Sequence, residues 1–265
     1  MKKILLAFDR TRFSEGAFDF AKHMNEQEPI LLTGVFPGDT VGDSGLIPRY
    51  DKDETMIANN IKRFESLCRI NGINCKVHKQ IFDFAMPELK KETIFSDLLI
   101  IGSEAFYETP GKDYLQGSLR ELLRISKCAV IVVPEKSKYP QTNILAYDGS
   151  NSSVFAIKQF SYLFPGLRDN KTILIYVNEE KGYDIPHEEY IAELAARHFP
   201  DLTLLRLHND RNRLFNEWLN NNKQPILVSG AFGRSAISQL FTKSFVYEVI
   251  GEHKLPVFVA HGKYE

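Results

Sequence analysis

Two short segments combine residue types that can hold a small anionic ligand at the end of a strand. Asp9 begins the run Asp-Arg-Thr-Arg-Phe-Ser-Glu-Gly-Ala, and Asp148 begins Asp-Gly-Ser-Asn-Ser-Ser-Val-Phe-Ala. Both runs follow an apolar stretch and fit the pattern Asp-x-[Ser/Thr]-x-x-Ser-x-x-Ala. Aspartates in this setting either contact a ligand or serve as loop and helix-cap residues. Both interpretations remain open at this point.

Two glycine-containing loops supply the other half of each candidate site. Glycine lets main-chain N–H groups approach an anion closely, and a helix N-terminus favours negative charge. The loops are therefore predicted to face a small anionic molecule. An alternative is that the glycines only end strands, and that Ser118-Leu-Arg-Glu121 is a capping box that starts a helix without a ligand. The candidate residues are Gly102, Gly117 and Ser118 in the first loop and Gly230, Gly233, Lys243 and Ser244 in the second.

The repetition of these motifs predicts a duplicated domain. Asp9 and Asp148 are 148 − 9 = 139 residues apart. Later landmarks repeat as well, since 97–102 matches 225–230 at an offset of 128 and 129–133 matches 256–260 at an offset of 127. The first copy therefore carries 139 − 128 = 11 more residues between its first and fourth strands. The Gly-, Pro- and Asp-rich segment 37–50 is predicted to be an exposed loop that holds part of them and overhangs the first cleft.

Short apolar runs alternate with segments of helical spacing, such as 53–70 and 188–199. Runs of nearly continuous Ile, Leu and Val indicate strands covered on both faces, as in a parallel sheet. The sequence predicts an α/β fold of two tandem Rossmann-like domains, 1–136 and 141–265, each a doubly wound five-stranded parallel sheet, paired as an intramolecular pseudo-dimer. The expected strands are 4–8, 30–36, 74–81, 98–101, 129–133, 143–147, 172–177, 202–207, 226–229 and 257–260.

Composition excludes several classes of function. The 33 basic and 34 acidic side chains give a net charge of −1, which offers no broad positive field for nucleic acid. Cys68, Cys75 and Cys128 form no Cys-x-x-Cys pair, and reduced, buried thiols are expected. The seven histidines lack metal-ligand spacing, so no metal site is predicted. The first apolar run is too short for a membrane span or a secretion signal, and we expect a cytoplasmic protein.

The second glycine loop resembles the Gly-x2-Gly-x9-Gly-[Ser/Thr] signature of the universal stress protein family, and Asp148-Gly-Ser-x-x-Ser resembles that family's opening motif. With the five-unit layout, the resemblance covers nearly the whole chain as a tandem pair. It implies a stress-response regulatory protein that binds ATP or another adenine nucleotide, with magnesium, mainly in the second domain. In nucleotide-binding members ATP lies across these loops, with its phosphates at the terminal Gly-[Ser/Thr] and the first-strand aspartate near the nucleoside.

Both domains depart from that signature. Lys243 occupies the third glycine position, where its side chain would either obstruct the phosphates or contact them as a cation. In the first domain Ala105 replaces the second glycine, Arg10 replaces the glycine after the aspartate, and the spacer before Gly117 holds 11 residues instead of nine. These losses keep a second hypothesis open, a stress-protein scaffold that binds protein partners or another small ligand. Further homodimerisation is left open.

Enzymatic chemistry has little support in the sequence. No Ser, His and Asp set is indicated by spacing, and the P-loop, the ATP pyrophosphatase loop and the nucleotidylyltransferase motif are absent. No catalytic residue is therefore predicted, and slow ATP hydrolysis is a third hypothesis. The run from Arg206 to Arg213 either presents cations to a ligand or forms a solvated face.

Overall fold

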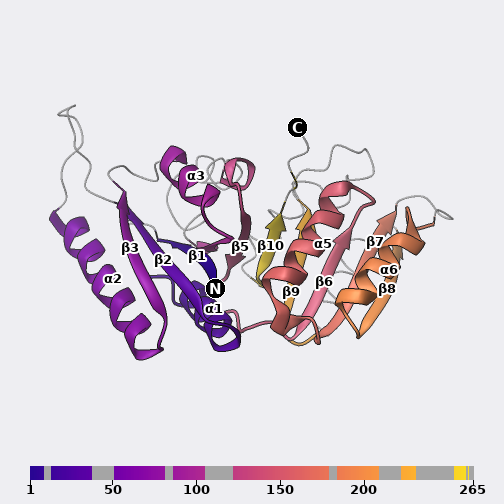
Figure 1. Cartoon of the computed structure of the whole chain (residues 1–265), viewed down its shortest axis with the longest axis horizontal. Coiled ribbons are helices and arrows are strands. Elements are labelled where there is room, and N and C mark those ends of the chain that lie inside the picture. Colours follow the sequence, from indigo (N-terminus) through magenta and orange to yellow (C-terminus); the bar gives the residue numbers. More distant parts are fainter. Residues whose placement is uncertain are drawn as a thin grey trace. The chain divides into compact units, whose positions relative to one another are not determined.

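The computed structural model describes residues 1–8, 13–37, 51–80, 86–104, 122–178, 184–208, 222–230, 254–260 and 262. The chain divides into two compact units, Met1–Glu135 and Lys136–Glu265 (Figure 1). The division falls within the charged segment 134–141. Each unit is described separately below.

Unit 1 is a parallel sheet with the strand order β3-β2-β1-β4-β5. Every residue of β4 and β5 is buried, as the continuous apolar runs predicted. The strands are β1 (Lys2–Ala7), β2 (Ile30–Pro37), β3 (Asn74–Gln80), β4 (Leu98–Gly102) and β5 (Ala129–Val133), and the helices are α1 (Glu15–Gln27), α2 (Asp51–Ile70) and α3 (Met86–Ile94).

Unit 2 has the strand order β8-β7-β6-β9-β10. Counted along each unit, both sheets therefore have the order third, second, first, fourth, fifth. The first strand therefore lies at the centre of each sheet, between the second and the fourth. The elements are β6 (Thr142–Tyr147), α5 (Asn151–Leu163), the short 3-10 helix η2 (Pro165–Leu167), β7 (Lys171–Asn178), α6 (Glu188–His198), β8 (Leu202–His208), β9 (Pro225–Gly230) and β10 (Val257–Ala260).

Strand register confirms the duplication residue by residue. Ile4 pairs with Leu98 in unit 1, and Asn143 pairs with Ile226 in unit 2. The first strands are thus related by the offset of 139 and the fourth strands by the offset of 128, as the motifs predicted. All ten predicted strands are present, with ends that differ from the prediction by at most two residues. The doubly wound α/β fold is therefore confirmed in both halves.

The connection between the second and third strands holds the extra length of unit 1. It spans residues 38–73 in unit 1 and 179–201 in unit 2, which is 36 residues against 23. Helix α2 has 20 residues and α6 has 11, so the helix accounts for nine of the 13 additional residues. Most of the excess therefore lies in α2. The predicted loop, apart from Pro37, falls outside the described residues.

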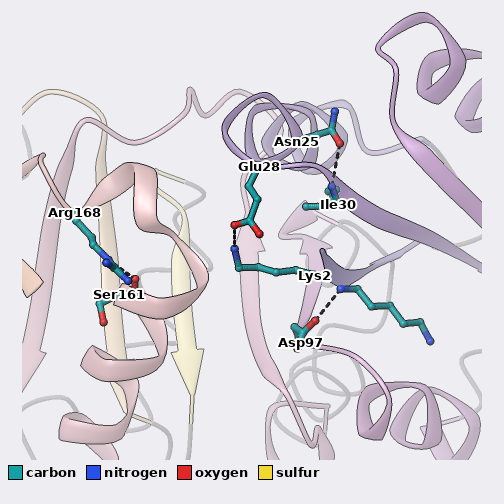
Figure 2. Close-up of polar contacts among 8 residues, drawn as sticks. Lys2, Asn25, Glu28, Ile30, Asp97, Ser161 and Arg168 are labelled. Carbon is teal, nitrogen blue, oxygen red and sulfur yellow. Dashed lines mark hydrogen bonds and ion pairs between the residues drawn. The ribbon is translucent and has the colours of Figure 1, made fainter.

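Polar contacts hold the amino-terminal ends of β1 and β4 in unit 1, as Figure 2 shows. The Asp97 carboxylate accepts a hydrogen bond from the Lys3 N–H at 2.8 Å, and the Asp97 N–H donates to the Lys3 carbonyl at 2.9 Å. Lys2 forms an ion pair with Glu28, and this hydrogen-bonded ammonium group lowers the pKa of the Glu28 carboxyl. These contacts fix one edge of the sheet, while the candidate site lies at the carboxyl edge.

Helix α2 packs through one buried stripe. Ile57, Ile61, Phe64 and Cys68 recur at helical spacing and are each at most 8% exposed. No described helix has the length and apolar character needed to cross a membrane.

Candidate functional site

The turn between β6 and α5 in unit 2 is organised by Asp148. Its Oδ1 atom accepts hydrogen bonds from the N–H of Ser150 at 2.9 Å and from the Ser150 hydroxyl at 2.5 Å. Ser150 is the N-cap of α5, and its Oγ accepts a hydrogen bond from the N–H of Ser153 at 3.2 Å. Gly149 has a φ of 79°, a conformation that glycine adopts without strain. Asp148 therefore holds the loop that leads into the Ser150 cap, a local loop role of the kind that the sequence offered as one of two interpretations.

Gly230, the last residue of β9, packs against this same turn. A Cβ atom at Gly230 would lie 2.6 Å from the carbonyl carbon of Ser152 and 2.6 Å from the nitrogen of Ser153. The end of β9 therefore packs main chain against main chain on the first turn of α5. The equivalent Gly102 in unit 1 approaches the side chain of Ser14, whose Oγ would lie 2.5 Å from a Cβ atom. The strand-four glycines thus have a packing role in both units.

The other predicted site residues fall outside the described residues. The positions that depart from the family signature also fall outside the described residues. These residues are Asp9, Gly117, Ser118, Gly233, Lys243 and Ser244, together with Arg10 and Ala105.

A segment that the sequence analysis did not identify covers the β6–α5 turn. The Tyr147 hydroxyl donates a hydrogen bond to the carbonyl of Pro186 at 2.8 Å. The Pro186 ring also packs on the turn, with its Cβ 3.0 Å from the position that a Cβ of Gly149 would occupy. Ile185 anchors the segment because its side chain is buried. Residues 184–187 therefore restrict access to the turn from this side.

Tyr147, the last residue of β6, pairs in register with Tyr176 of β7, and their ring centroids are 6.4 Å apart. Burial raises the pKa of both hydroxyls, and the Asp148 carboxylate raises each pKa further. Both groups therefore stay protonated at neutral pH and can donate hydrogen bonds at the carboxyl edge of the sheet.

Replacing Tyr147 by phenylalanine should loosen the segment over the turn without disturbing the sheet, because unit 1 carries Phe8 at the equivalent position. The lost hydrogen bond to Pro186 is expected to cost about 1 kcal/mol. Hydrogen–deuterium exchange of residues 184–187 should accelerate, while exchange of 142–147 stays unchanged. Equal exchange of 184–187 in both proteins would show that the hydroxyl does not hold the segment.

The corresponding end of the unit 1 sheet is filled by aromatic rings. Phe8 stacks on Phe36 with centroids 4.5 Å apart and an interplanar angle of 8°, and Phe13 lies 4.9 Å from Phe8. Phe36 is the equivalent of Tyr176 in strand register. Ala7 pairs with Val35, so the next residue, Phe36, lies level with Phe8, as Tyr176 lies level with Tyr147. Unit 1 thus has apolar rings where unit 2 has tyrosine hydroxyls.

An internal carboxylate occupies the N-terminus of α1 in unit 1. One oxygen of Glu135 accepts a hydrogen bond from the Glu15 N–H at 2.7 Å, and the other accepts one from the Ser14 hydroxyl at 3.1 Å. The Glu135 N–H in turn donates to the carboxylate of Glu104 at 2.9 Å. Burial raises the pKa of Glu15, an effect that Arg63 opposes and that Glu135 reinforces. Among the described residues, the carboxylates of Glu104 and Glu135 thus lie at the start of α1, and their charge disfavours a phosphate there.

Unit 2 lacks these acids. At the offset of 128 Glu104 corresponds to Phe232, and at the offset of 127 Glu135 corresponds to Gly262. The two halves therefore share a fold and differ in the charge that their sequences place beside the first-strand helix.

Arg206 does not present an unpaired cation to this edge. Its guanidinium donates two hydrogen bonds to the Glu188 carboxylate, at 2.7 and 2.5 Å, and lies 3.6 Å from Asp184. The rest of the predicted basic run, from 209 onward, lies outside the described residues. Within the described ranges, no group of three His, Cys, Asp or Glu side chains is placed to hold a metal ion.

Neither a protein-family model nor the sequence of a curated protein matches this chain. Solved structures do match it. A universal stress protein from Archaeoglobus fulgidus DSM 4304 superimposes with a TM-score of 0.70 at 15% identity, covering 100% of this chain and 98% of that one. A candidate universal stress protein from Pseudomonas aeruginosa UCBPP-PA14 gives a TM-score of 0.57 at 14% identity, covering 98% and 92%. The chain therefore has the universal stress protein fold, as the resemblance of its motifs predicted.

Proposed function

We propose that this chain is a regulatory protein of the universal stress type, and that unit 2 binds ATP or another adenine nucleotide with magnesium. The observation that carries the proposal is the packing of Gly230 on the first turn of α5. It places the end of β9, where the second glycine loop begins, beside the turn that follows Asp148 at the carboxyl edge of the sheet. In open α/β sheets, ligands bind outside this edge where the strand order reverses.

Each motif residue of unit 2 has a distinct role in this proposal. Asp148 and Ser150 hold the turn, and the second carboxylate oxygen of Asp148 would accept a hydrogen bond from the nucleoside. Main-chain N–H groups of the loop at Gly233 and Ser244 would bind the phosphates. Lys243 would contribute a positive charge to the same phosphates.

Unit 1 is the weaker candidate because Glu135 already satisfies the N-terminus of α1. A nucleotide phosphate near that position would meet the carboxylates of Glu135 and Glu104. The corresponding sequence positions of unit 2, Phe232 and Gly262, carry no charge.

Thermal unfolding with and without magnesium and ATP tests the proposal. A ligand that binds only the folded state raises stability, by about 2.7 kcal/mol at a hundred times its dissociation constant. We expect ATP to raise the melting temperature and Gly233→Val to abolish that rise. Gly117→Val, at the phosphate end of the unit 1 signature, is the matched control and should leave the rise intact. No shift at millimolar ATP, or equal loss in both variants, would remove the support for a nucleotide site in unit 2.

A second function, a scaffold that binds no nucleotide, is favoured by the packing of Pro186 over the Gly149 turn. In that case the carboxyl edge of unit 2 is closed and protein partners or another small ligand use a different surface. Recovery of bound nucleotide from the purified protein would count directly against this alternative.

A further inference from the structure

Cys68 and Cys75 lie on facing surfaces of unit 1. Cys68 is fully buried and completes the inward stripe of α2. On β3, the side chains alternate, because Asn74 and Lys76 are exposed while Cys75 is half-buried. Cys75 therefore points to the side of the sheet on which α2 packs.

The connection between α2 and β3 reverses the chain direction and brings Cys75 back towards the last turn of α2. The N–H of Ile73 donates a hydrogen bond to the carbonyl of Cys68 at 2.9 Å, and Gly72 takes a φ of 64° that reverses the chain direction. In this arrangement Cys75 lies near enough to Cys68 to raise the pKa of the Cys68 thiol. The sequence predicts reduced, buried thiols, whereas Cys75 and Cys128 are half-buried and only Cys68 is buried.

The two thiols differ in reactivity. Burial raises the pKa of the Cys68 thiol, and the neighbouring Cys75 and Glu65 raise it further. Cys68 is therefore protonated and shielded at neutral pH, and thiols in this state react slowly with oxidants. Cys75 is accessible from solvent and is the residue of the pair that an oxidant can reach first.

We propose that Cys68 and Cys75 form an oxidisable dithiol that a peroxide converts to a disulfide between α2 and β3. The Cys75 sulfur attacks one peroxide oxygen, the O–O bond breaks, and Cys75 becomes a sulfenic acid as the first water forms. The Cys68 sulfur then attacks the Cys75 sulfur, the S–O bond breaks, and the departing hydroxide takes the Cys68 proton to form the second water. Two thiols are thereby oxidised and one peroxide is reduced.

The disulfide would join the last turn of α2 to β3, which is the terminal strand of the unit 1 order and pairs with β2. A crosslink across this short connection limits the freedom of the unfolded chain. The oxidised protein should therefore unfold at a higher temperature than the reduced protein. The inference is independent of nucleotide binding.

Peptide mapping after treatment with hydrogen peroxide tests the pair. We expect the native protein to lose the mass of two hydrogen atoms and to yield a crosslinked fragment that contains both cysteines. Cys75→Ser should abolish the crosslink and the gain in melting temperature. Cys128→Ser should preserve both, since Cys128 lies beside Ser126 at 3.8 Å and burial raises the pKa of its thiol to about 11.

Three results would overturn the proposal. They are the retention of both thiols after peroxide treatment, oxidation of Cys75 to its sulfinic acid while Cys68 stays reduced, and a crosslink that joins two chains. Circular dichroism of Cys75→Ser before treatment establishes that the variant is folded. The same treatment of the wild-type protein in denaturant should lower the yield of the crosslink, because the α2–β3 connection no longer holds the thiols together.

Discussion

Replacing Phe64 by alanine is expected to lower the free energy of unfolding of unit 1 by about 3–5 kcal/mol. Phe64 is 0% exposed, and its ring lies 5.9 Å from Phe8, 5.8 Å from Phe36 and 6.2 Å from Phe18 between centroids. The substitution removes apolar contacts and leaves a cavity among rings that cannot all move to fill it. Denaturant titration followed by far-ultraviolet circular dichroism measures the loss.

Phe95→Ala provides the matched control in the same unit. Phe95 is 66% exposed, so the same chemical change there should alter stability by less than about 0.5 kcal/mol. A loss at Phe64 no greater than at Phe95 would show that the aromatic cluster does not hold the carboxyl end of β1 in place.

Gly230→Ala is expected to destabilise unit 2 by about 1–3 kcal/mol. The added methyl group would lie 2.6 Å from main-chain atoms of Ser152 and Ser153, so relief requires the start of α5 to move. Denaturant titration followed by far-ultraviolet circular dichroism measures the loss.

Gly102→Ala is the corresponding change in unit 1. Its nearest neighbour is the Ser14 hydroxyl, a side-chain atom that can rotate away. The loss of stability, followed by circular dichroism, should therefore be smaller than for Gly230→Ala. The opposite order would mean that main-chain contact with α5 does not determine the cost.

The strands and the duplication could be predicted because both depend on local sequence. Buried parallel strands require continuous apolar runs, and the repeated aspartate and glycine motifs gave the offsets that strand register later confirmed. The role of Asp148 in the turn before α5 could also be predicted, because its partner Ser150 is only two residues away.

The contacts that distinguish the two units could not be predicted in this way. Glu135 reaches Ser14 across 121 residues, and Pro186 reaches Tyr147 across 39. Such contacts depend on which strands become neighbours and on where each connection returns to the sheet, and no local pattern encodes either. The sequence predicts that part of the additional length of unit 1 lies in the segment 37–50, but it does not show that α2 holds most of that length, because the end of a helix is weakly marked in sequence.

The Glu135 carboxylate at the start of α1 has a consequence for the shape of the ligand response. Two equivalent sites in one molecule can be coupled, and coupling is what turns a rise in ligand concentration into a sigmoidal transition. Because Glu135 occupies the N-terminus of α1 in unit 1, the nucleotide site proposed for unit 2 is expected to act alone, and titration of that site should follow a simple hyperbola with a Hill coefficient of about 1. Gene duplication would then have produced a graded sensor instead of a threshold switch.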